Sequence, residues 1–334
     1  MSTVAQRQSD QPKSRSIFHL LPFLFKFFRY LDPTRDLPSF SMLPPAVLES
    51  GSSLEPGLTS CPTKAPIQAL FLSVDGTLLD EKHPDLSQST FNALRSLQKR
   101  GVRVALSTSR NLASILTIPK LAEFPFDGYI LAGGSEIYDR KRRLLEYQGY
   151  VPADLKVIFD ECQARKIPVF FHTGKPNLTL WTEESRAFAR SHHFLPVEIK
   201  PWKGEDVSML TIISTDIDLV RSILDLAPGM NWVSSAANQQ DLYPEGVNKA
   251  NAIEKMLACW NLEGACYAAF GKNKADESMF EQAALSIAMP HSHKSLRHKA
   301  DFVCEDHQEN TIACALKDLD LLDGSLCQIP TTDH

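Results

Sequence analysis

Polar side chains stand where strand-like segments of this 334-residue chain end. Ser73 and Asp75 lie at the end of the apolar run 67–74, and Thr108 lies near the end of the run 102–109. A carboxylate in such a place can transfer protons, and hydroxyl groups beside a lysine ammonium group can hold an anion. Taken alone, these residues are a modest signal, because an Asp-Gly turn after a strand is common.

The apolar runs predict a parallel sheet that brings these side chains together. Residues 67–74, 102–109 and 129–135 have the length and composition of strands that are buried on both faces. Residues 87–100 carry the amphipathic pattern of a helix. Strand, helix and strand at this spacing form a right-handed βαβ unit, and ligands of such sheets bind at the carboxyl ends of the strands.

Four short motifs occur in chain order at predicted strand ends or helix starts. They are Ser73-Val74-Asp75-Gly76-Thr77, Ser107-Thr108-Ser109-Arg110, Pro244-Glu245-Gly246-Val247-Asn248-Lys249 and Phe270-Gly271-Lys272-Asn273-Lys274-Ala275-Asp276. Together they resemble the motifs of the haloacid-dehalogenase (HAD) superfamily of phosphatases, over residues 67–322. The long insert between the second and third motifs resembles the Cof-type branch of that superfamily, which carries a large α/β cap.

The resemblance implies an α/β protein with a Rossmann-like, doubly wound parallel-sheet core and an inserted α+β cap domain. The core is expected at residues 67–147 and 241–323, and the cap at residues 148–240. Residues 1–66 are expected to be a disordered leader with a short hydrophobic segment, because its second half is rich in Pro, Ser and Gly. Residues 324–334 are expected to be a tail.

The resemblance also implies roles for individual residues. In the superfamily one aspartate attacks phosphorus, a second one transfers the proton, and a threonine and a lysine hold the phosphoryl oxygens. Carried over to this chain, Asp75 is the acid and base, and Thr108 and Lys249 bind phosphate. Ser73 stands in the place of the nucleophile. A carboxylate is already ionised at neutral pH, whereas a serine hydroxyl needs a base or a metal to attack.

The motif that binds Mg²⁺ in the superfamily is altered as well. Lys272 stands where the resemblance places a metal-binding carboxylate, Ala275 replaces an asparagine, and Asp276 remains. Because Mg²⁺ prefers oxygen ligands in octahedral geometry, no metal cofactor is expected. Lys272 is expected to point into the former metal position, to pair with Asp75 and Asp276, and to help bind phosphate.

Three neighbouring features each allow two interpretations. Gly133 and Gly134 either approach the substrate closely or form a tight turn. Arg110 is expected to be a helix-entry or domain-interface residue rather than a substrate ligand. His291 and His293 are expected to be surface or polar core residues rather than a metal-binding pair.

Three functions are compatible with these residues. The leading hypothesis is a catalytically impaired homologue of the Cof-type phosphatases that keeps a pocket for phosphate or a small phosphorylated metabolite. The first alternative is an active, Mg²⁺-dependent phosphatase on a phosphorylated sugar or similar metabolite, which uses Ser73 or another group. The second alternative is an interaction module whose leader docks on a membrane surface or a protein partner.

The composition indicates which partners and which cellular location to expect. The net charge of −5 argues against a nucleic-acid partner. The seven cysteines are odd in number and form no C-x-x-C pair, which indicates unpaired thiols and a cytoplasmic protein. The apolar segment Ile17 to Leu31 is too short to span a membrane. It is interpreted as a local hydrophobic cluster or, alternatively, as an interfacial anchor that gives a peripheral membrane contact, and less readily as a secretory signal.

Deleting residues 1–60 should leave a protein that folds cooperatively, because the first predicted core strand begins only at Ile67. The measurement is a thermal melt of the shortened and full-length chains, followed by a vesicle-sedimentation assay. Loss of the melting transition in the shortened chain would place the leader within the fold.

Overall fold

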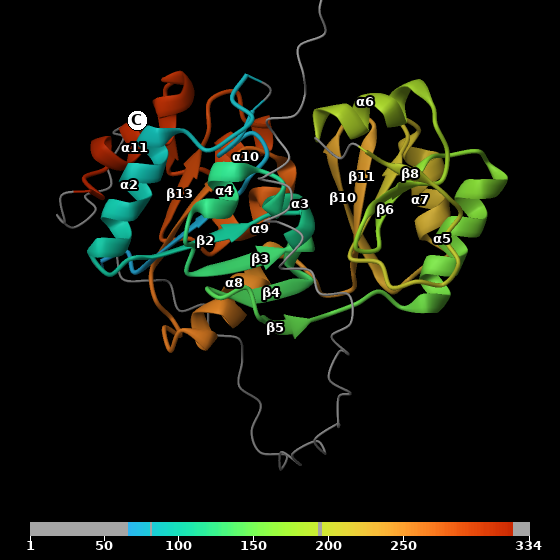
Figure 1. Ribbon diagram of the computed structural model, residues 1–334, viewed down its shortest axis with the longest axis horizontal. Coiled ribbons are helices and arrows are strands. Elements are labelled where there is room, and N and C mark those ends of the chain that lie inside the picture. The colour runs from blue at the N-terminus through green and yellow to red at the C-terminus, as the bar shows by residue number, and fades with distance from the viewer. Residues whose placement is uncertain (1–65, 81, 193–195, 323–334) are drawn as a thin grey trace, which may run out of the picture. The chain divides into compact units, whose positions relative to one another are not determined.

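A computed structural model of the chain describes residues 66–80, 82–192 and 196–322. Within these ranges one sheet contains β1 (Ala69–Leu72), β2 (Arg103–Ser107), β3 (Gly128–Leu131), β4 (Glu136–Asp139), β5 (Leu144–Tyr147), β12 (Tyr267–Gly271), β13 (Leu285–Ala288) and β14 (Phe302–Val303). Its eight strands follow the order β14-β13-β12-β1-β2-β3-β4-β5 (Figure 1). The pairs from β14 to β3 are all parallel.

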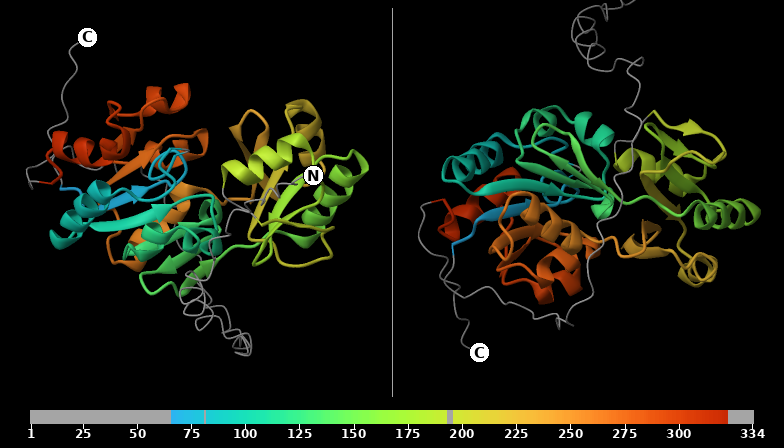
Figure 2. Two further views of the ribbon diagram at one scale, coloured as in Figure 1. Left: turned by 45° about the horizontal axis from the view of Figure 1, so that its top comes forward. Right: turned by 90° about the horizontal axis from the view of Figure 1, so that it is seen from below.

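Helices cover both faces of this sheet. They are α2 (Gln88–Lys99), α3 (Leu112–Leu116), α4 (Pro119–Glu123), α8 (Lys249–Cys259), α9 (Glu277–Glu281), α10 (Lys294–Lys299) and α11 (Thr311–Asp318). Alternate residues of β1 serve the two faces: Leu70 and Leu72 pack in a cluster with α2, α4 and α11, and Phe71 packs with α8, α9 and α10. Figure 2 shows the sheet between these two helix layers. The predicted doubly wound α/β core is therefore confirmed.

The start, the buried face and the end of helix α2 follow from its local sequence. The side chain of Ser87 accepts a hydrogen bond from the backbone N–H of Thr90 and caps the first turn. Leu94 and Leu97 are buried against the sheet. The chain leaves the helix at Gly101, whose φ of 89° is in the left-handed region that favours glycine. The helix predicted at residues 87–100 is confirmed.

Strands β4 and β5 were not expected from the sequence. They extend the sheet in the antiparallel sense, because the chain turns back on itself after β3. The turn uses Gly133 and Gly134, both with positive φ. Leu144 and Leu145 of β5 are about half exposed, so this edge strand lacks the buried apolar pattern by which the other strands were predicted.

A second sheet is formed by the segment between β5 and α8. It contains β6 (Val169–His172), β7 (Pro176–Leu178), β8 (Glu198–Ile199), β9 (Met209–Ile213), β10 (Met230–Ala236) and β11 (Gln239–Pro244), in the order β10-β11-β9-β6-β7-β8. Helices α5 (Pro152–Ala164) and α7 (Ile217–Leu224) share one cluster with it, and α6 (Glu183–Ser191) shares another. The inserted α+β unit is present, and the exact domain boundaries stay predictions.

The leader, including Ile17 to Leu31, and the tail lie outside the described residues. None of the described helices is long and apolar enough to cross a membrane. Four described cysteines are free, namely Cys162, Cys259, Cys304 and Cys314. Cys266 is disulfide-bonded, so the expectation that all thiols are unpaired is wrong for this residue. Sequence spacing could not show it, because a disulfide depends on which thiols the fold brings together.

Candidate active site

One pocket gathers most of the predicted site residues at the carboxyl ends of β1, β2 and β12. Ser73, Asp75, Thr108, Lys249 and Asp276 all line it. Neighbouring strands pair in register, so the residues that follow them reach the same edge of the sheet. His192, Ser235, Gln239 and Asp241, from the part of the chain that forms the second sheet, line the same pocket.

Ser73 is a buried hydroxyl with a local partner. Its side chain is 4% exposed, and its Oγ lies 2.6 Å from Oγ1 of Thr77. Its backbone N–H donates to the carbonyl of Phe270 on the neighbouring strand. The described hydrogen-bond partner of this hydroxyl is thus another hydroxyl, which is too weak a base to activate it.

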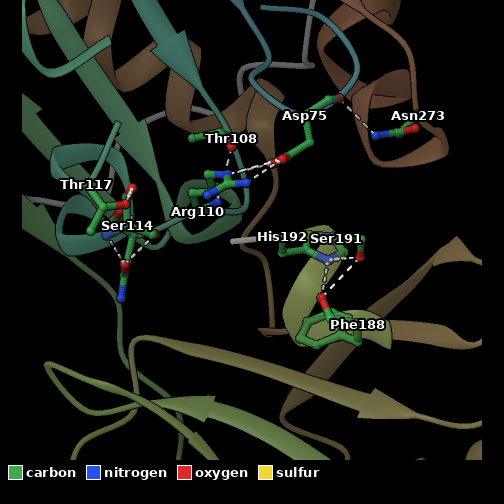
Figure 3. A network of polar contacts seen from close by, with 10 residues as sticks. Asp75, Thr108, Arg110, Ser114, Thr117, Phe188, Ser191, His192 and Asn273 are labelled. Atoms are coloured by element: carbon green, nitrogen blue, oxygen red, sulfur yellow. Dashed lines mark hydrogen bonds and ion pairs between the residues drawn. The ribbon is translucent and has the colours of Figure 1, made fainter. Parts of the chain in front are cut away.

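Asp75 forms a bidentate ion pair with Arg110. Nη2 of Arg110 donates to Oδ1 at 2.7 Å, and Nε donates to Oδ2 at 2.9 Å (Figure 3). The Arg110 side chain is 2% exposed and that of Asp75 is 29% exposed. Burial raises the pKa of Asp75, but the charge and hydrogen bonds of Arg110, with smaller effects of His192 and Lys249, outweigh it and hold the pKa below its usual value.

The sequence predicted the position of Arg110 at a helix entry but not its ion pair. Arg110 does stand at a helix entry, since the next residue, Asn111, caps α3 with its side chain. The pairing with Asp75 was missed. The available signal was an arginine at the end of one strand beside an acid at the end of the adjacent strand.

Lys249 and Asp276 form a second, more deeply buried pair. Their side chains are 5% and 2% exposed, and Nζ of Lys249 lies 2.5 Å from Oδ1 of Asp276. Nζ also donates to the carbonyl of Ser107 at 2.9 Å. The other oxygen, Oδ2, accepts the backbone N–H groups of Lys272 and Asn273. Both oxygens of this carboxylate are therefore engaged.

The side chain of Lys272 lies elsewhere, and the prediction that it pairs with Asp75 and Asp276 is wrong. Its Nζ is 3.3 Å from the point that a Cβ on Gly76 would occupy. Lys272 lines a different pocket, which His83 and His291 also line. Gly76 has no side chain and leaves this space to the lysine stem. Lys272 meets Asp276 through its backbone N–H rather than its ammonium group.

Gly133 and Gly134 are sites of close packing. A Cβ on Gly133 would overlap Cε1 of Tyr243, and one on Gly134 would lie 2.6 Å from the carbonyl oxygen of Asn248. The N–H of Gly133 donates to the carbonyl of Thr108. These contacts favour the tight-turn interpretation, and the proximity to substrate stays a prediction.

The two histidines considered as a metal pair have other contacts. Nε2 of His291 lies 3.9 Å from Asp306, and Nδ1 of His293 lies 2.5 Å from Oγ of Ser295. Among the described residues no cluster of three or more His, Cys, Asp or Glu side chains has a geometry that could hold a metal ion.

Residues 70–316 match the family of haloacid dehalogenase-like hydrolases. The chain belongs to this family. It is 24% identical over 253 residues to the 5-amino-6-(5-phospho-D-ribitylamino)uracil phosphatase YcsE of Bacillus subtilis, covering 75% of this chain and 95% of that protein. It is 25% identical over 271 residues to a Streptococcus pyogenes protein whose name joins a phosphatase to a peptidyl-prolyl cis-trans isomerase. That match covers 80% of this chain and 57% of the longer relative.

Solved structures of this family share the fold. A HAD subclass IIB sugar phosphatase superimposes with a TM-score of 0.67 at 21% identity, over 75% of this chain and 98% of that one. A phosphoryl-transfer superfamily structure superimposes with a TM-score of 0.69 at 20% identity, over 75% of this chain and 98% of that one. The predicted membership of the HAD superfamily is confirmed, and the fold with its inserted unit is shared with these structures.

Replacing Gly133 by alanine should destabilise the protein by about 2–4 kcal/mol, because the new methyl group would overlap the Tyr243 ring and φ is 68°. Gly101 is the matched control: its φ is 89°, but nothing lies within 4 Å of the methyl group that alanine would add there. Gly101→Ala should cost about 1 kcal/mol. Urea denaturation measures both, and equal losses would contradict the packing argument.

Replacing Asp75 by asparagine should cost about 2–4 kcal/mol at neutral pH, because it leaves the buried Arg110 without its carboxylate. A carboxylate with a lowered folded-state pKa stabilises above its unfolded pKa, and this contribution disappears as the pH falls through the folded value. The difference in the free energy of unfolding between the wild type and the Asp75→Asn variant should therefore shrink below pH 3.8. Asp218→Asn, on the exposed Arg221–Asp218 pair, is the control and should change little. A gap that does not depend on pH would contradict the ion-pair account.

Proposed function

We propose that this member of the HAD-like hydrolases binds phosphate or a small phosphorylated metabolite and is impaired as a phosphatase. One observation carries the proposal. The two acids that remain from the family pattern, Asp75 and Asp276, are each paired with a buried cation, and the nucleophile position holds the hydroxyl of Ser73.

The chemistry of this pocket argues against efficient turnover. Ser73 has to lose a proton before it can attack phosphorus, and its described partner is Thr77 rather than a base. Asp75, with its lowered pKa, is held ionised by Arg110 at neutral pH and is a poor proton donor to a leaving group. Two steps of phosphate ester hydrolysis therefore lack a competent group.

The donor set does not fit Mg²⁺. Both oxygens of Asp75 accept hydrogen bonds from Arg110, and both oxygens of Asp276 accept from Lys249 or backbone N–H groups. Mg²⁺ needs oxygen ligands that are free to complete an octahedron. Its electrostatic place is taken by Arg110 and Lys249, so we propose that the protein needs no metal cofactor.

Anion binding is compatible with the same pocket. Lys249 and Thr108 line it, and Asp75, which also lines it, is paired with the buried guanidinium of Arg110. Lys272 is not part of this proposal, because its side chain lines another pocket. The relative named for 5-amino-6-(5-phospho-D-ribitylamino)uracil supports a small phosphorylated metabolite as the ligand class.

The cysteines bear on the cellular location of the protein. The four free cysteines support a cytoplasmic location, and the disulfide of Cys266 argues against it. A membrane or partner contact of Ile17 to Leu31 stays a prediction about residues outside the described ranges.

The test is an assay with 4-nitrophenyl phosphate, with and without millimolar Mg²⁺. We expect no turnover above a heat-treated control, no Mg²⁺-dependent rise in melting temperature, and saturable binding of inorganic phosphate by calorimetry that EDTA leaves unchanged. Turnover at roughly 1 s⁻¹ or faster, within the usual enzymatic range, would contradict the proposal, and its loss in Ser73→Ala would favour the active alternative.

Restoring the family pattern provides the complementary test. Ser73→Asp combined with Lys272→Asp returns two carboxylates to the motif, so Mg²⁺ binding should appear in the double variant and exceed the sum of the single variants. The control pairs Ser73→Asp with Lys274→Asp, which makes the same charge change at an exposed lysine of the same loop. Mg²⁺ binding that is equal in both double variants would show a general charge effect instead.

A further inference from the structure

The turn between β4 and β5 concentrates positive charge. Arg140, Lys141, Arg142 and Arg143 follow one another there, in a chain whose net charge is −5. Asp139, the last residue of β4, is the acid beside them. Four cations next to one acid give this turn a positive field that attracts anionic surfaces.

Hydrogen bonds fix the shape of this turn. Oδ1 of Asp139 accepts the backbone N–H groups of Lys141 and Arg143 at 2.8 and 2.9 Å, and Oδ2 pairs with the Arg143 side chain. Arg142 has a φ of 60°, and its guanidinium group turns inward to lie 5.9 Å from the centre of the Tyr129 ring. Arg142 therefore anchors the turn, and the other three cations extend from a fixed backbone.

These three cations face solvent with little compensation. The side chains of Arg140 and Arg143 are 57% and 72% exposed, and Lys141 is exposed as well. Arg140 and Arg103 both approach Oδ1 of Asp127, at 3.8 and 3.4 Å, so one carboxylate serves two guanidinium groups. Ion pairs of such exposed side chains contribute little to stability. The cations of the turn are therefore available to a partner.

Exposed apolar side chains adjoin the cationic turn. Among the described residues eight large apolar side chains are exposed, and four of them belong to residues 144–151, namely Leu144, Leu145, Tyr147 and Val151. Leu144 pairs with Tyr138 across the β4–β5 ladder. Tyr147 pairs two residues further along, with Glu136. Because paired residues share a face of a sheet, Leu144 and Tyr147 lie on the same face.

The edge of the sheet at β5 suits a lipid surface better than a further strand. Among the described strands β5 is at the end of the first sheet, next to β4 (Figure 1). Its ladder with β4 shifts between Ile137 and Tyr138, which leaves Leu145 as an extra, bulged residue. Such a bulge hinders the addition of a strand from a second copy or from a peptide. A lipid surface requires no ladder, since it takes cations at its anionic headgroups and leucine and tyrosine side chains in its interfacial layer.

We propose that residues 140–147, here called the docking hairpin, bind a membrane surface that contains anionic lipid. The exposed cations contact the headgroups, and Leu144, Leu145 and Tyr147 enter the interfacial layer. The proposal does not rest on the impaired catalysis argued above, because no residue of the docking hairpin lines the pocket of Asp75. It is also separate from the segment Ile17 to Leu31, whose contact with a membrane is a prediction of its own.

The experiment uses the full-length protein and vesicles of phosphatidylcholine with or without phosphatidylserine. Sedimentation at rising lipid concentration measures the bound fraction of the protein. We expect saturable binding to the vesicles that contain phosphatidylserine, and binding about tenfold or more weaker to phosphatidylcholine alone. Because the attraction is largely electrostatic, binding should weaken as the salt concentration rises.

A cation variant tests the charged part of the docking hairpin. It combines Arg140→Gln, Lys141→Gln and Arg143→Gln. Its control makes the same charge change at exposed positions of α10 and α11, with Lys294→Gln, Arg297→Gln and Lys317→Gln. The cation variant should bind phosphatidylserine vesicles about tenfold or more weakly than its control, since each cation near such a surface adds to the attraction. Binding of inorganic phosphate should be the same in both.

A leucine variant tests the apolar part. It combines Leu144→Ser with Leu145→Ser, and its control combines Leu180→Ser with Leu226→Ser, which are exposed leucines elsewhere in the chain. We expect vesicle binding about fivefold weaker in the leucine variant and little change in the control. Thermal melts verify that each variant is folded. The cation and leucine variants test the same surface independently, so the failure of one to fold leaves the other decisive.

Three outcomes would overturn the proposal: no saturable binding to phosphatidylserine vesicles, equal binding by the cation variant and its control, or equal binding by the leucine variant and its control. Release of the protein from the vesicles by soluble polyglutamate, at matched ionic strength, would assign the surface to an acidic protein segment instead of a lipid. None of these measurements bears on 4-nitrophenyl phosphate hydrolysis, so failure here is distinguishable from failure of the proposed function.

Discussion

The buried ionised side chains at the carboxyl edge of the first sheet have to be neutralised within the protein, and this requirement organises the site. Asp276 and Lys249 are almost completely buried, and each would carry a large desolvation cost without the other. Asp75 is more exposed, but its partner Arg110 is buried. The cost of burying Arg110 without a carboxylate therefore keeps this pair together. The geometry of the pocket follows from these two pairings.

The same requirement accounts for the position of Lys272. A third cation between Asp75 and Asp276 would meet carboxylate oxygens that already accept from Arg110, Lys249 and backbone N–H groups. The lysine stem instead fills the space beside Gly76. In the altered motif each of the two remaining acids is thus balanced by a protein cation, Asp75 by Arg110 and Asp276 by Lys249.

Sequence reasoning reached the fold and the gathering of site residues, because both depend on patterns that are local or shared with a large superfamily. Buried strands show as apolar runs, and residues such as Ser73 and Thr108 are placed by the strands that precede them. The sequence did not predict which residue pairs with each charged side chain. It depends on side-chain direction across neighbouring strands, and a sequence does not distinguish Lys272 from Arg110 as the partner of Asp75. Strand β5 was missed for a different reason: an exposed edge strand needs no apolar pattern.

The position of β1 in the middle of the first sheet has a consequence for how the protein is made. One neighbour, β2, follows after some thirty residues, whereas the other, β12, begins only at Tyr267, after the whole second sheet. The strand Ala69–Leu72 is entirely buried in the folded protein. During synthesis one of its edges therefore has no partner strand while residues 169–244 leave the ribosome. The second sheet is contiguous in sequence and can close during that interval. Synthesis thus favours the inserted unit as the first to finish, and the interval before β12 arrives is the time at which the nascent chain is most open to aggregation.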